Sequence, residues 1–191
     1  MSKIITIIGT RPEIIRLSRI LPKLDKTNKN ILVHTGQNYD YELDKIFFKE
    51  LNVRKPDYYL GAKGSFAKQL SIICKKLETI IIKEKPEKFV VLGDTNSSLG
   101  AIIAKRLGLK VYHLEAGNRS YLKNSPEEVN RKIIDHTSDI NMPYTNRSSD
   151  NLLYEGIKRK NIFVIGNPIF EVINYYQDKI KKNKILDKLK I

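Results

Sequence analysis

Three carboxylates and two arginines stand in polar segments that follow apolar runs of this sequence. Asp94 and Glu115 come at or just after the ends of β-branched stretches, and Glu127 opens a helical pattern. Arg11 and Arg131 lie in segments of the same kind. Carboxylates can remove and deliver protons, and arginines can hold an anionic leaving group. Each residue alone is weak evidence, but the set indicates proton transfer on a phosphorylated or nucleotide-linked substrate.

The first of these loops reads Gly9-Thr10-Arg11-Pro12-Glu13. Thr10 and Glu13 have the spacing of a capping box at a helix start. Arg11 is not needed for that cap, and an arginine beside a helix N-terminus is typical of anion sites. We therefore favour diphosphate binding for Arg11. Arg16, one turn further on, either supports the same anion or is an ordinary surface arginine.

Two further loops contain candidates of unequal specificity. Gln37 stands among Gly, Asn and Asp residues that are common in turns, and it is the one position there that we keep as a polar substrate contact. Asp94 has an alternative role as the cap of the next helix. Glu115 ends an apolar strand and precedes small residues, so no structural role explains it.

The segment 125–131 starts another helix. Ser125 fits the N-cap, and Glu128 three residues later completes a capping box, so Glu128 is explained structurally. Glu127 and Arg131 are four residues apart and share a helix face. They form either a surface ion pair worth a few tenths of a kcal/mol, or a carboxylate that an arginine holds toward a cleft.

Short β-branched runs alternate with longer helical patterns, which predicts an α/β fold with a Rossmann-like, doubly wound parallel sheet. Strands are expected at 3–8, 30–34, 88–92, 110–114, 139–143 and 161–165, with a weaker candidate at 58–60. Helices are expected at 12–24, 41–51, 66–83, 95–107, 126–137, 147–155 and about 169–181. Ligands of such sheets bind beyond the carboxyl ends of the strands, where the candidate residues lie.

Composition and missing motifs narrow the function. The net charge is +14, but the lysines are scattered and no nucleic-acid-binding signature accompanies them, so no nucleic acid partner is expected. The single cysteine, Cys74, excludes an internal disulfide framework and a cysteine-based zinc site. Neither a dinucleotide fingerprint nor a P-loop occurs. No stretch resembles a signal peptide or a membrane span. We therefore expect a cytoplasmic protein with no membrane partner, metal or cofactor.

The motifs of this sequence resemble those of a known family. The motifs that carry the resemblance recur in order over nearly the whole chain: 9–13 (GTRPE), 35–37 (TGQ), 93–95 (GDT), 115–119 (EAGNR), 126–131 (PEEVNR) and 166–167 (GN). They resemble the N-terminal half of the non-hydrolysing UDP-N-acetylglucosamine 2-epimerases. That resemblance implies one half of a two-domain glycosyltransferase-B-type fold, with an active site between the domains and no NAD or metal.

The resemblance also implies a reaction and roles for residues. The C2 proton of the sugar is removed as UDP is eliminated, leaving a 2-acetamidoglucal, and re-addition of UDP with protonation on the opposite face gives UDP-ManNAc from UDP-GlcNAc. Asp94, Glu115 and Glu127 match the acid–base positions of the family. Arg11, His113 and Arg131 match positions that line the nucleotide-sugar site, and Arg16 stands where a lysine is common.

The resemblance also bears on the sugar, the oligomeric state and the domain organisation. The stretches 36–43 and 118–121 resemble a capsule and O-antigen branch, some members of which act on 6-deoxy or otherwise modified UDP-HexNAc sugars. The family also implies a homodimer. Its members are about twice as long, so we expect a Rossmann-like domain at 1–167 and an interdomain helix with the start of a truncated second domain at 168–191.

Three functions follow from this reading. The first is a UDP-N-acetylglucosamine 2-epimerase, with little or no activity until a second-domain chain completes the cleft. The second is half of a glycosyltransferase-B glycosyltransferase, against which the trio Asp94, Glu115 and Glu127 argues. The third is a non-catalytic nucleotide-sugar-binding remnant, which would bind a UDP-sugar without turnover.

Overall fold

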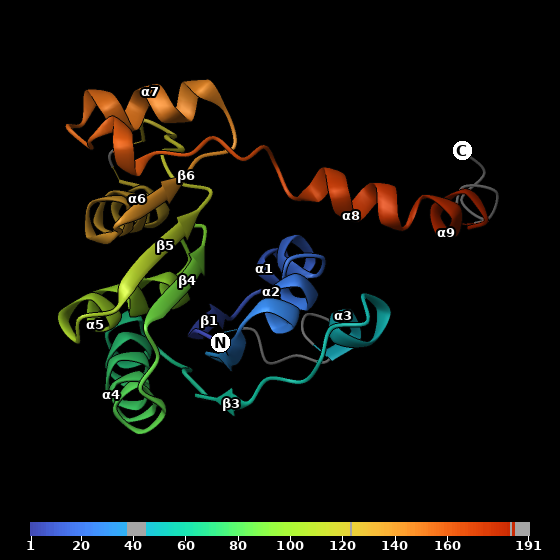
Figure 1. The fold of residues 1–191 in the computed structure, drawn as a ribbon, viewed down its shortest axis with the longest axis horizontal. Coiled ribbons are helices and arrows are strands. Elements are labelled where there is room, and N and C mark those ends of the chain that lie inside the picture. The colour runs from blue at the N-terminus through green and yellow to red at the C-terminus, as the bar shows by residue number, and fades with distance from the viewer. Residues whose placement is uncertain (38–44, 123, 184, 186–191) are drawn as a thin grey trace.

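The computed structural model describes residues 1–37, 45–122, 124–183 and 185, and its centre is a six-stranded parallel sheet (Figure 1). The strand order is β3-β2-β1-β4-β5-β6. The strands are β1 (Lys3–Ile8), β2 (Lys29–His34), β3 (Tyr58–Tyr59), β4 (Lys88–Leu92), β5 (Lys110–Leu114) and β6 (Ile140–Met142). The order reverses between β1 and β4, as in a doubly wound sheet.

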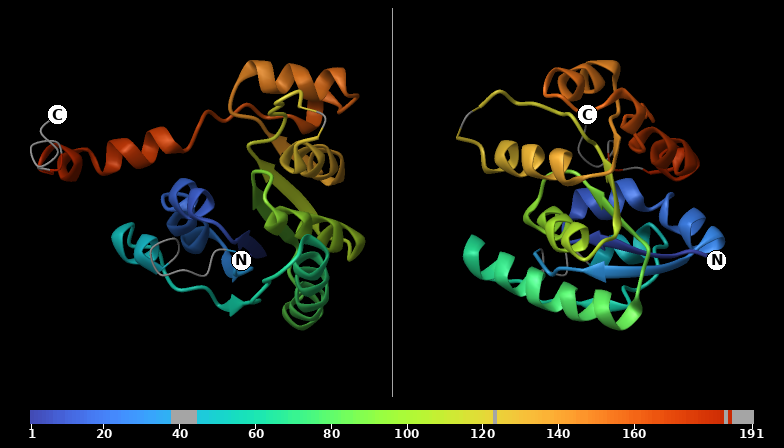
Figure 2. Two further views of the ribbon diagram at one scale, coloured as in Figure 1. Left: turned by 180° about the vertical axis from the view of Figure 1, so that it is seen from behind. Right: turned by 60° about the vertical axis from the view of Figure 1, so that its left-hand side comes forward.

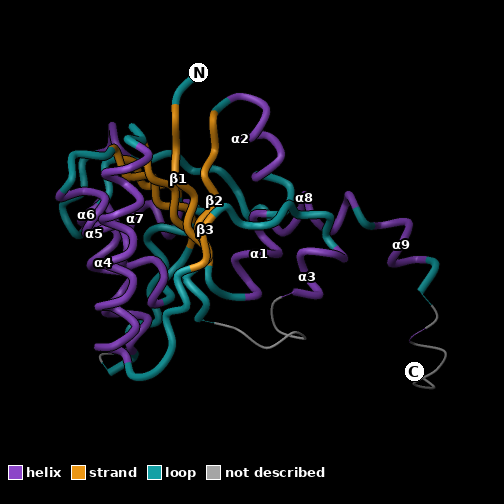
Figure 3. Tube along the Cα trace, turned by 90° about the horizontal axis from the view of Figure 1, so that it is seen from below, coloured by secondary structure: helices purple, strands orange, loops and turns teal. Residues whose placement is uncertain are grey.

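Helices cover both faces of this sheet, and Figure 3 shows them on either side of the strands. The helices of the described residues are α1 (Arg11–Leu17), α2 (Leu21–Thr27), α3 (Lys45–Glu50), α4 (Phe66–Glu84), η2 (Asn96–Leu99), α5 (Gly100–Arg106), α6 (Pro126–Thr137), α7 (Asn146–Tyr154), η3 (Arg159–Asn161), α8 (Ile169–Tyr175) and α9 (Gln177–Lys181). Apolar residues of α4, α5 and α6 pack on one face, and those of α1 to α3 pack on the other. The predicted fold class is confirmed.

Alternation along the strands builds the two cores. Ile5 and Ile7 of β1 pack with Leu77 of α4 on one face, whereas Ile8 packs with Leu17 of α1 on the other. All of these side chains are buried. Strands covered on both faces need apolar residues at successive positions, which explains the continuous apolar runs of the sequence.

Some expected elements differ from the structure, among them the helix expected over about 169–181, which is divided into α8 and α9. The helix expected over 12–24 is two helices, since Pro22 has no N–H to continue the helix and Ser18 ends α1. The strand expected at 161–165 is wrong: a single bridge joins Ile162 to Asn141, and the run 163–165 stays about half exposed. The weak strand at 58–60 is confirmed as β3. Residues 41–44 of the expected helix at 41–51 lie outside the described residues.

The C-terminal helices α8 and α9 extend away from the sheet (Figures 1 and 2). α8 contacts the α1–α2 region, where the Arg19 guanidinium lies 3.5 Å from the centroid of the Tyr175 ring. Lys23 also pairs with Glu171 at 2.6 Å. The domain boundary at 167–168 stays a prediction. In the part of the chain that is described, no helix is both long enough and apolar enough to cross a membrane.

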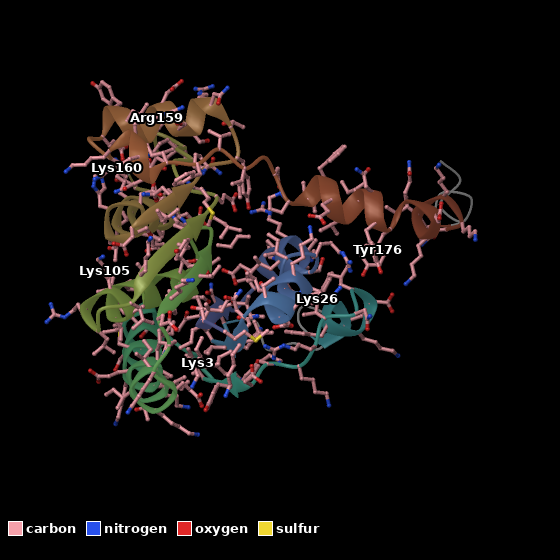
Figure 4. All side chains as sticks on the ribbon, in the orientation of Figure 1. Lys3, Lys26, Lys105, Arg159, Lys160 and Tyr176 are labelled. Carbon is pink, nitrogen blue, oxygen red and sulfur yellow. The ribbon has the colours of Figure 1, made fainter. Side chains whose placement is uncertain are left out.

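The basic side chains come from many elements. Figure 4 labels Lys3 on β1, Lys26 on α2, Lys105 on α5 and Lys160 on η3, and they lie far apart in the view. Several basic residues are paired, as in the 2.5 Å bond from Lys105 to Asp139. The +14 charge is therefore spread over different elements of the fold.

Candidate functional site

The loops after β1, β2 and β4 meet at the carboxyl edge of the sheet. Gly9 follows β1 at a point where an added Cβ would overlap the hydroxyls of Thr35 and Ser97. Those two hydroxyls hydrogen-bond to each other at 2.7 Å. Only a glycine lets the three loops approach this closely.

Glu115 is the most unusual carboxylate at this edge. It follows β5 in the left-handed backbone region, with φ of 71°, which a non-glycine residue adopts at a cost in free energy. Its carboxylate pairs with Arg16 and accepts a 3.3 Å hydrogen bond from Asn118. Burial raises the pKa of Glu115, the charge of Asp94 raises it further, and Arg16 opposes both effects. A carboxyl group with a raised pKa is suited to general acid–base chemistry.

Asp94 and Arg131 form a second carboxylate–arginine pair. Arg131, on α6, contacts the Asp94 carboxylate, and both side chains are about four-fifths buried. Arg131 also donates to Glu128 at 3.2 Å, and Asn130 donates to the Asp94 backbone carbonyl at 2.9 Å. The structure therefore brings together Asp94, Glu115, Arg16 and Arg131, which come from four separate segments. Arg16 pairs with Glu115 and keeps 30% of its side chain exposed, and its role toward an anion stays a prediction.

The two glutamates of α6 exchange the structural roles that the sequence indicated. The Glu128 carboxylate does not form the expected capping box with Ser125. It is buried and accepts hydrogen bonds from Ser120 and Arg131. Glu127 is exposed and accepts a 2.8 Å bond from the Ser125 hydroxyl, so the arginine partner expected for Glu127 belongs to Glu128. The reason is helix geometry: Glu128 faces the segment at 119–120, and Glu127 faces outward.

His113 was expected to line the substrate site, and the geometry gives it a different position. Its side chain is fully buried, and both ring nitrogens are occupied, by Asp135 at 2.8 Å and by the Gly93 carbonyl at 3.0 Å. Direct contact with a substrate is not available from there. His113 instead fixes the loop that carries Asp94.

Asp135 and Arg119 form a buried network of ion pairs and hydrogen bonds that the motifs of the sequence do not predict. The Asp135 carboxylate accepts from His113, from the Gly117 backbone N–H at 3.2 Å and from Arg119 at 2.8 Å. Burial would raise the pKa of Asp135, but the bonds to His113 and Arg119 outweigh it and lower that pKa. The available signal is helical spacing, because Asp135 stands seven residues after Glu128 and therefore lies on the same buried face of α6.

Glu13 has a larger role than a helix cap. Its carboxylate accepts bonds from the backbone N–H groups of Gly9 (2.5 Å) and Thr10 (2.9 Å), and the capping box expected from Thr10 and Glu13 is present. It also accepts a 2.6 Å bond from the Thr95 hydroxyl. Burial raises the pKa of Glu13 to about 7. Glu13 thus joins the loops after β1 and β4.

The remaining predicted residues lie at the rim. Arg11 is exposed, with its guanidinium 5.9 Å from the centroid of the Phe47 ring, and it is available to an anion. Gln37 is half-buried and accepts a 3.3 Å bond from Ser97. An open groove of about 460 Å³ runs beside Asn118, Tyr121, Arg131 and Arg147. Among the described residues, no three His, Cys, Asp or Glu side chains are grouped as a metal ion would need.

Comparison with known proteins finds several 2-epimerases that are similar to this chain. The family model of UDP-N-acetylglucosamine 2-epimerase matches residues 22–190. A UDP-N-acetylglucosamine 2-epimerase homologue from Methanococcus maripaludis is 42% identical over 99% of the chain and 54% of its own length. A UDP-2,3-diacetamido-2,3-dideoxy-D-glucuronate 2-epimerase from Pseudomonas aeruginosa is 43% identical over 83% of the chain and 46% of its own length.

Solved structures are also similar to this chain. The Methanocaldococcus jannaschii UDP-GlcNAc 2-epimerase, in complex with UDP-GlcNAc and UDP, matches 98% of this chain and 52% of its own, with a TM-score of 0.92 and 41% identity. The lipopolysaccharide outer core galactosyltransferase WaaB shares the fold alone, with a TM-score of 0.61 and 15% identity over 86% of this chain and 45% of its own. The sheet is therefore one half of a glycosyltransferase-B-type fold.

The chain spans about half the length of the relatives it matches. The chain belongs to the UDP-N-acetylglucosamine 2-epimerase family.

Proposed function

We propose that this chain supplies the acid–base half of a non-hydrolysing 2-epimerase that acts on UDP-GlcNAc or a related UDP-HexNAc. The observation that carries the proposal is the mostly buried Glu115 carboxylate held against Arg16, near enough to Asp94 for the charge of that carboxylate to add to the effect of burial on the pKa of Glu115. Among the relatives named above, one is a 2-epimerase of a modified UDP-sugar, and a UDP-GlcNAc 2-epimerase is solved with UDP-GlcNAc and UDP bound.

The reaction needs a base at C2 and a cation at the leaving group. Glu115 takes the C2 proton while the bond from C1 to the UDP oxygen breaks, which leaves a C1–C2 double bond. In the reverse step UDP adds at C1, and a carboxylic acid delivers a proton to the opposite face of C2. Burial suits Glu115 to the first task, since a raised pKa makes a carboxylate a stronger base.

The proposed roles of the other residues follow from their positions in the structure. Arg11 and Arg16, at the carboxyl edge of β1, neutralise the charge that develops on the departing diphosphate. Asp94 and Glu127 are the candidates for the second acid, and Arg131 orients Asp94. Gln37 contacts the substrate at the rim, and His113 acts through Gly93 rather than on the substrate. The half of the relatives that this sequence does not cover would close the cleft, so we expect little activity without it.

The test is hydrogen exchange at C2. The chain is incubated with UDP-GlcNAc in D₂O, alone and mixed with the separately expressed second half of the Methanocaldococcus jannaschii relative, and the C2 proton is followed by NMR. Deuterium at C2 together with a manno product supports the proposal. Glu115→Gln should reduce the exchange rate by about 10²- to 10⁴-fold, the range of a lost general base. Glu78→Gln, the same substitution at an exposed glutamate of α4, is the control.

Other outcomes select other functions. Binding of UDP-GlcNAc without exchange, also in the presence of the second half, would favour a nucleotide-sugar-binding protein without turnover. Because the Pseudomonas aeruginosa relative acts on a modified sugar, a 6-deoxy and a hexuronate UDP-HexNAc are tested in parallel. Transfer of the sugar to an acceptor, with C2 stereochemistry unchanged, would indicate a glycosyltransferase.

A further inference from the structure

Tyr144 is a buried tyrosine whose hydroxyl lacks a partner. It lies two residues beyond β6, and its exposed fraction is 8%. Within the described residues its hydroxyl makes no hydrogen bond. A buried hydroxyl without a partner is unfavourable, so its retention calls for a partner that is present in another state of the site.

The sheet register places Tyr144 beside Glu115. β5 and β6 are neighbours with Leu114 opposite Met142, and the Glu115 backbone N–H donates to the Met142 carbonyl at 3.1 Å. Glu115 and Tyr144 therefore leave adjacent strands at the same edge. Burial raises the pKa of Tyr144, the charge of Glu115 raises it further and that of Arg16 lowers it, so the hydroxyl lies within electrostatic reach of both.

Glu115 has one strong partner at present. The groups that face it are Arg16 from α1, Asp94 from the loop after β4, His113 from β5 and Asn118 from its own loop. Only Arg16 forms an ion pair with it in the described part of the chain. Arg16 is the more exposed member of that pair, with 30% of its side chain exposed against 16% for Glu115, and it is a candidate for the substrate diphosphate. When Arg16 turns to an anion, the mostly buried Glu115 carboxylate loses its ion pair.

We propose that Tyr144 is a positioning residue that donates a hydrogen bond to the Glu115 carboxylate when Arg16 engages an anionic group of the substrate. The inference rests on the proposed function, because that function gives Arg16 its second partner. No proton is transferred, since Tyr144 stays protonated and donates only a hydrogen bond. The exchange of partners would keep Glu115 ionised and oriented in its buried place.

A double-mutant titration tests the exchange without turnover. The carboxyl ¹³C signal of Glu115, assigned by its loss in Glu115→Gln, is titrated in the chain itself, in Tyr144→Phe, in Arg16→Gln and in the double variant. Arg16→Gln imitates the departure of the arginine. We expect Tyr144→Phe to change the Glu115 midpoint little when Arg16 is present, and to raise it clearly in the Arg16→Gln background. An equal change in both backgrounds, or none in either, would overturn the proposal.

A second measurement leaves Tyr144 unchanged. The ¹³Cζ signal of Tyr144 should shift when Arg16→Gln is introduced, because the hydroxyl then gains a charged acceptor; an unmoved signal would contradict the exchange. Tyr144→Phe should also keep or raise the thermal midpoint of the chain, since it removes an unpartnered group.

The two proposals fail separately. If C2 exchange occurs but the double-mutant effects are additive, only the role of Tyr144 is wrong. If the two effects are coupled but no UDP-HexNAc undergoes exchange, the proposed function is wrong and the coupling is a property of the fold. In an active mixture, Tyr144→Phe should lower kcat with KM unchanged and move the acid limb of the pH profile to higher pH, because Glu115 then ionises later. A purely structural role would not move that limb.

Discussion

The Thr95 hydroxyl donates a 2.6 Å hydrogen bond to the buried carboxylate of Glu13. This bond joins the loop after β4, which carries Asp94, to the start of α1, which carries Arg11 and Arg16. Because the same carboxylate also accepts from the backbone of Gly9 and Thr10, one acidic group holds two loops of the candidate site together.

Glu13 should make folding stability depend on pH. Burial raises the pKa of Glu13 from 4.5 to about 7, so the folded chain holds this proton over a pH range in which the unfolded chain has lost it. The contribution of Glu13 to stability therefore falls as pH rises from about 4.5 to 7. Urea unfolding of the wild type and Glu13→Gln, at pH 5 and pH 8, should show the wild type losing stability relative to the variant. A constant difference between the two proteins would contradict this.

Arg131 should matter for stability much more than Arg147. Arg131 is paired with Asp94 and Glu128, whereas Arg147 is exposed and forms no ion pair in the part of the chain that is described. Arg131→Met should cost about 1–3 kcal/mol of the free energy of unfolding, because it leaves charged acceptors without a donor. Arg147→Met is the matched control and should change it by less than about 0.5 kcal/mol. Equal effects in urea titrations would refute the assignment.

The neighbours Glu127 and Glu128 should separate activity from stability. Glu128 is buried, and hydrogen bonds from Ser120 and Arg131 lower its pKa although burial alone would raise it. Glu128→Gln should therefore cost about 1–3 kcal/mol of unfolding free energy. Glu127→Gln should leave stability nearly unchanged and reduce C2 exchange in the active mixture. Thermal unfolding and the NMR exchange assay, run on both variants, measure the two effects. The reverse result would place Glu128, and not Glu127, among the acid–base residues.

Gly117 should tolerate no side chain. It has φ of 75°, and an added Cβ would overlap the Ser148 carbonyl of α7. Gly117→Ala should cost about 3 kcal/mol or more, the sum of backbone strain and overpacking. Gly108 has φ of 86° but nothing within 4 Å of an added Cβ, so Gly108→Ala measures the strain alone, about 1–2 kcal/mol. Guanidinium unfolding of the two variants gives the difference, and equal losses would show that α7 does not press on Gly117.

Local pattern was enough to predict most of the fold. The apolar runs at β1, β2, β4 and β5 predicted strands because strands covered on both faces need such residues at successive positions. The alternation of strand and helix predicted the doubly wound sheet, and the rule that ligands bind at the carboxyl edge selected Asp94 and Glu115. The prediction of a strand at 161–165 was wrong because this apolar segment at the sheet edge has the same residue pattern as a buried strand, although no layer covers it.

The residue pattern along the chain predicts the fold class and places the carboxylates and arginines that we propose for acid–base chemistry in loops. Which of these side chains pair became visible in three dimensions: Arg16 with Glu115, Arg131 with Asp94 and Glu128, and His113 with Asp135. These contacts join residues of different loops or opposite faces of one helix turn, and spacing along the chain does not encode which side chain faces inward. Burial, which sets the pKa of Glu13 and Glu115, likewise depends on the packing of segments that are distant in sequence.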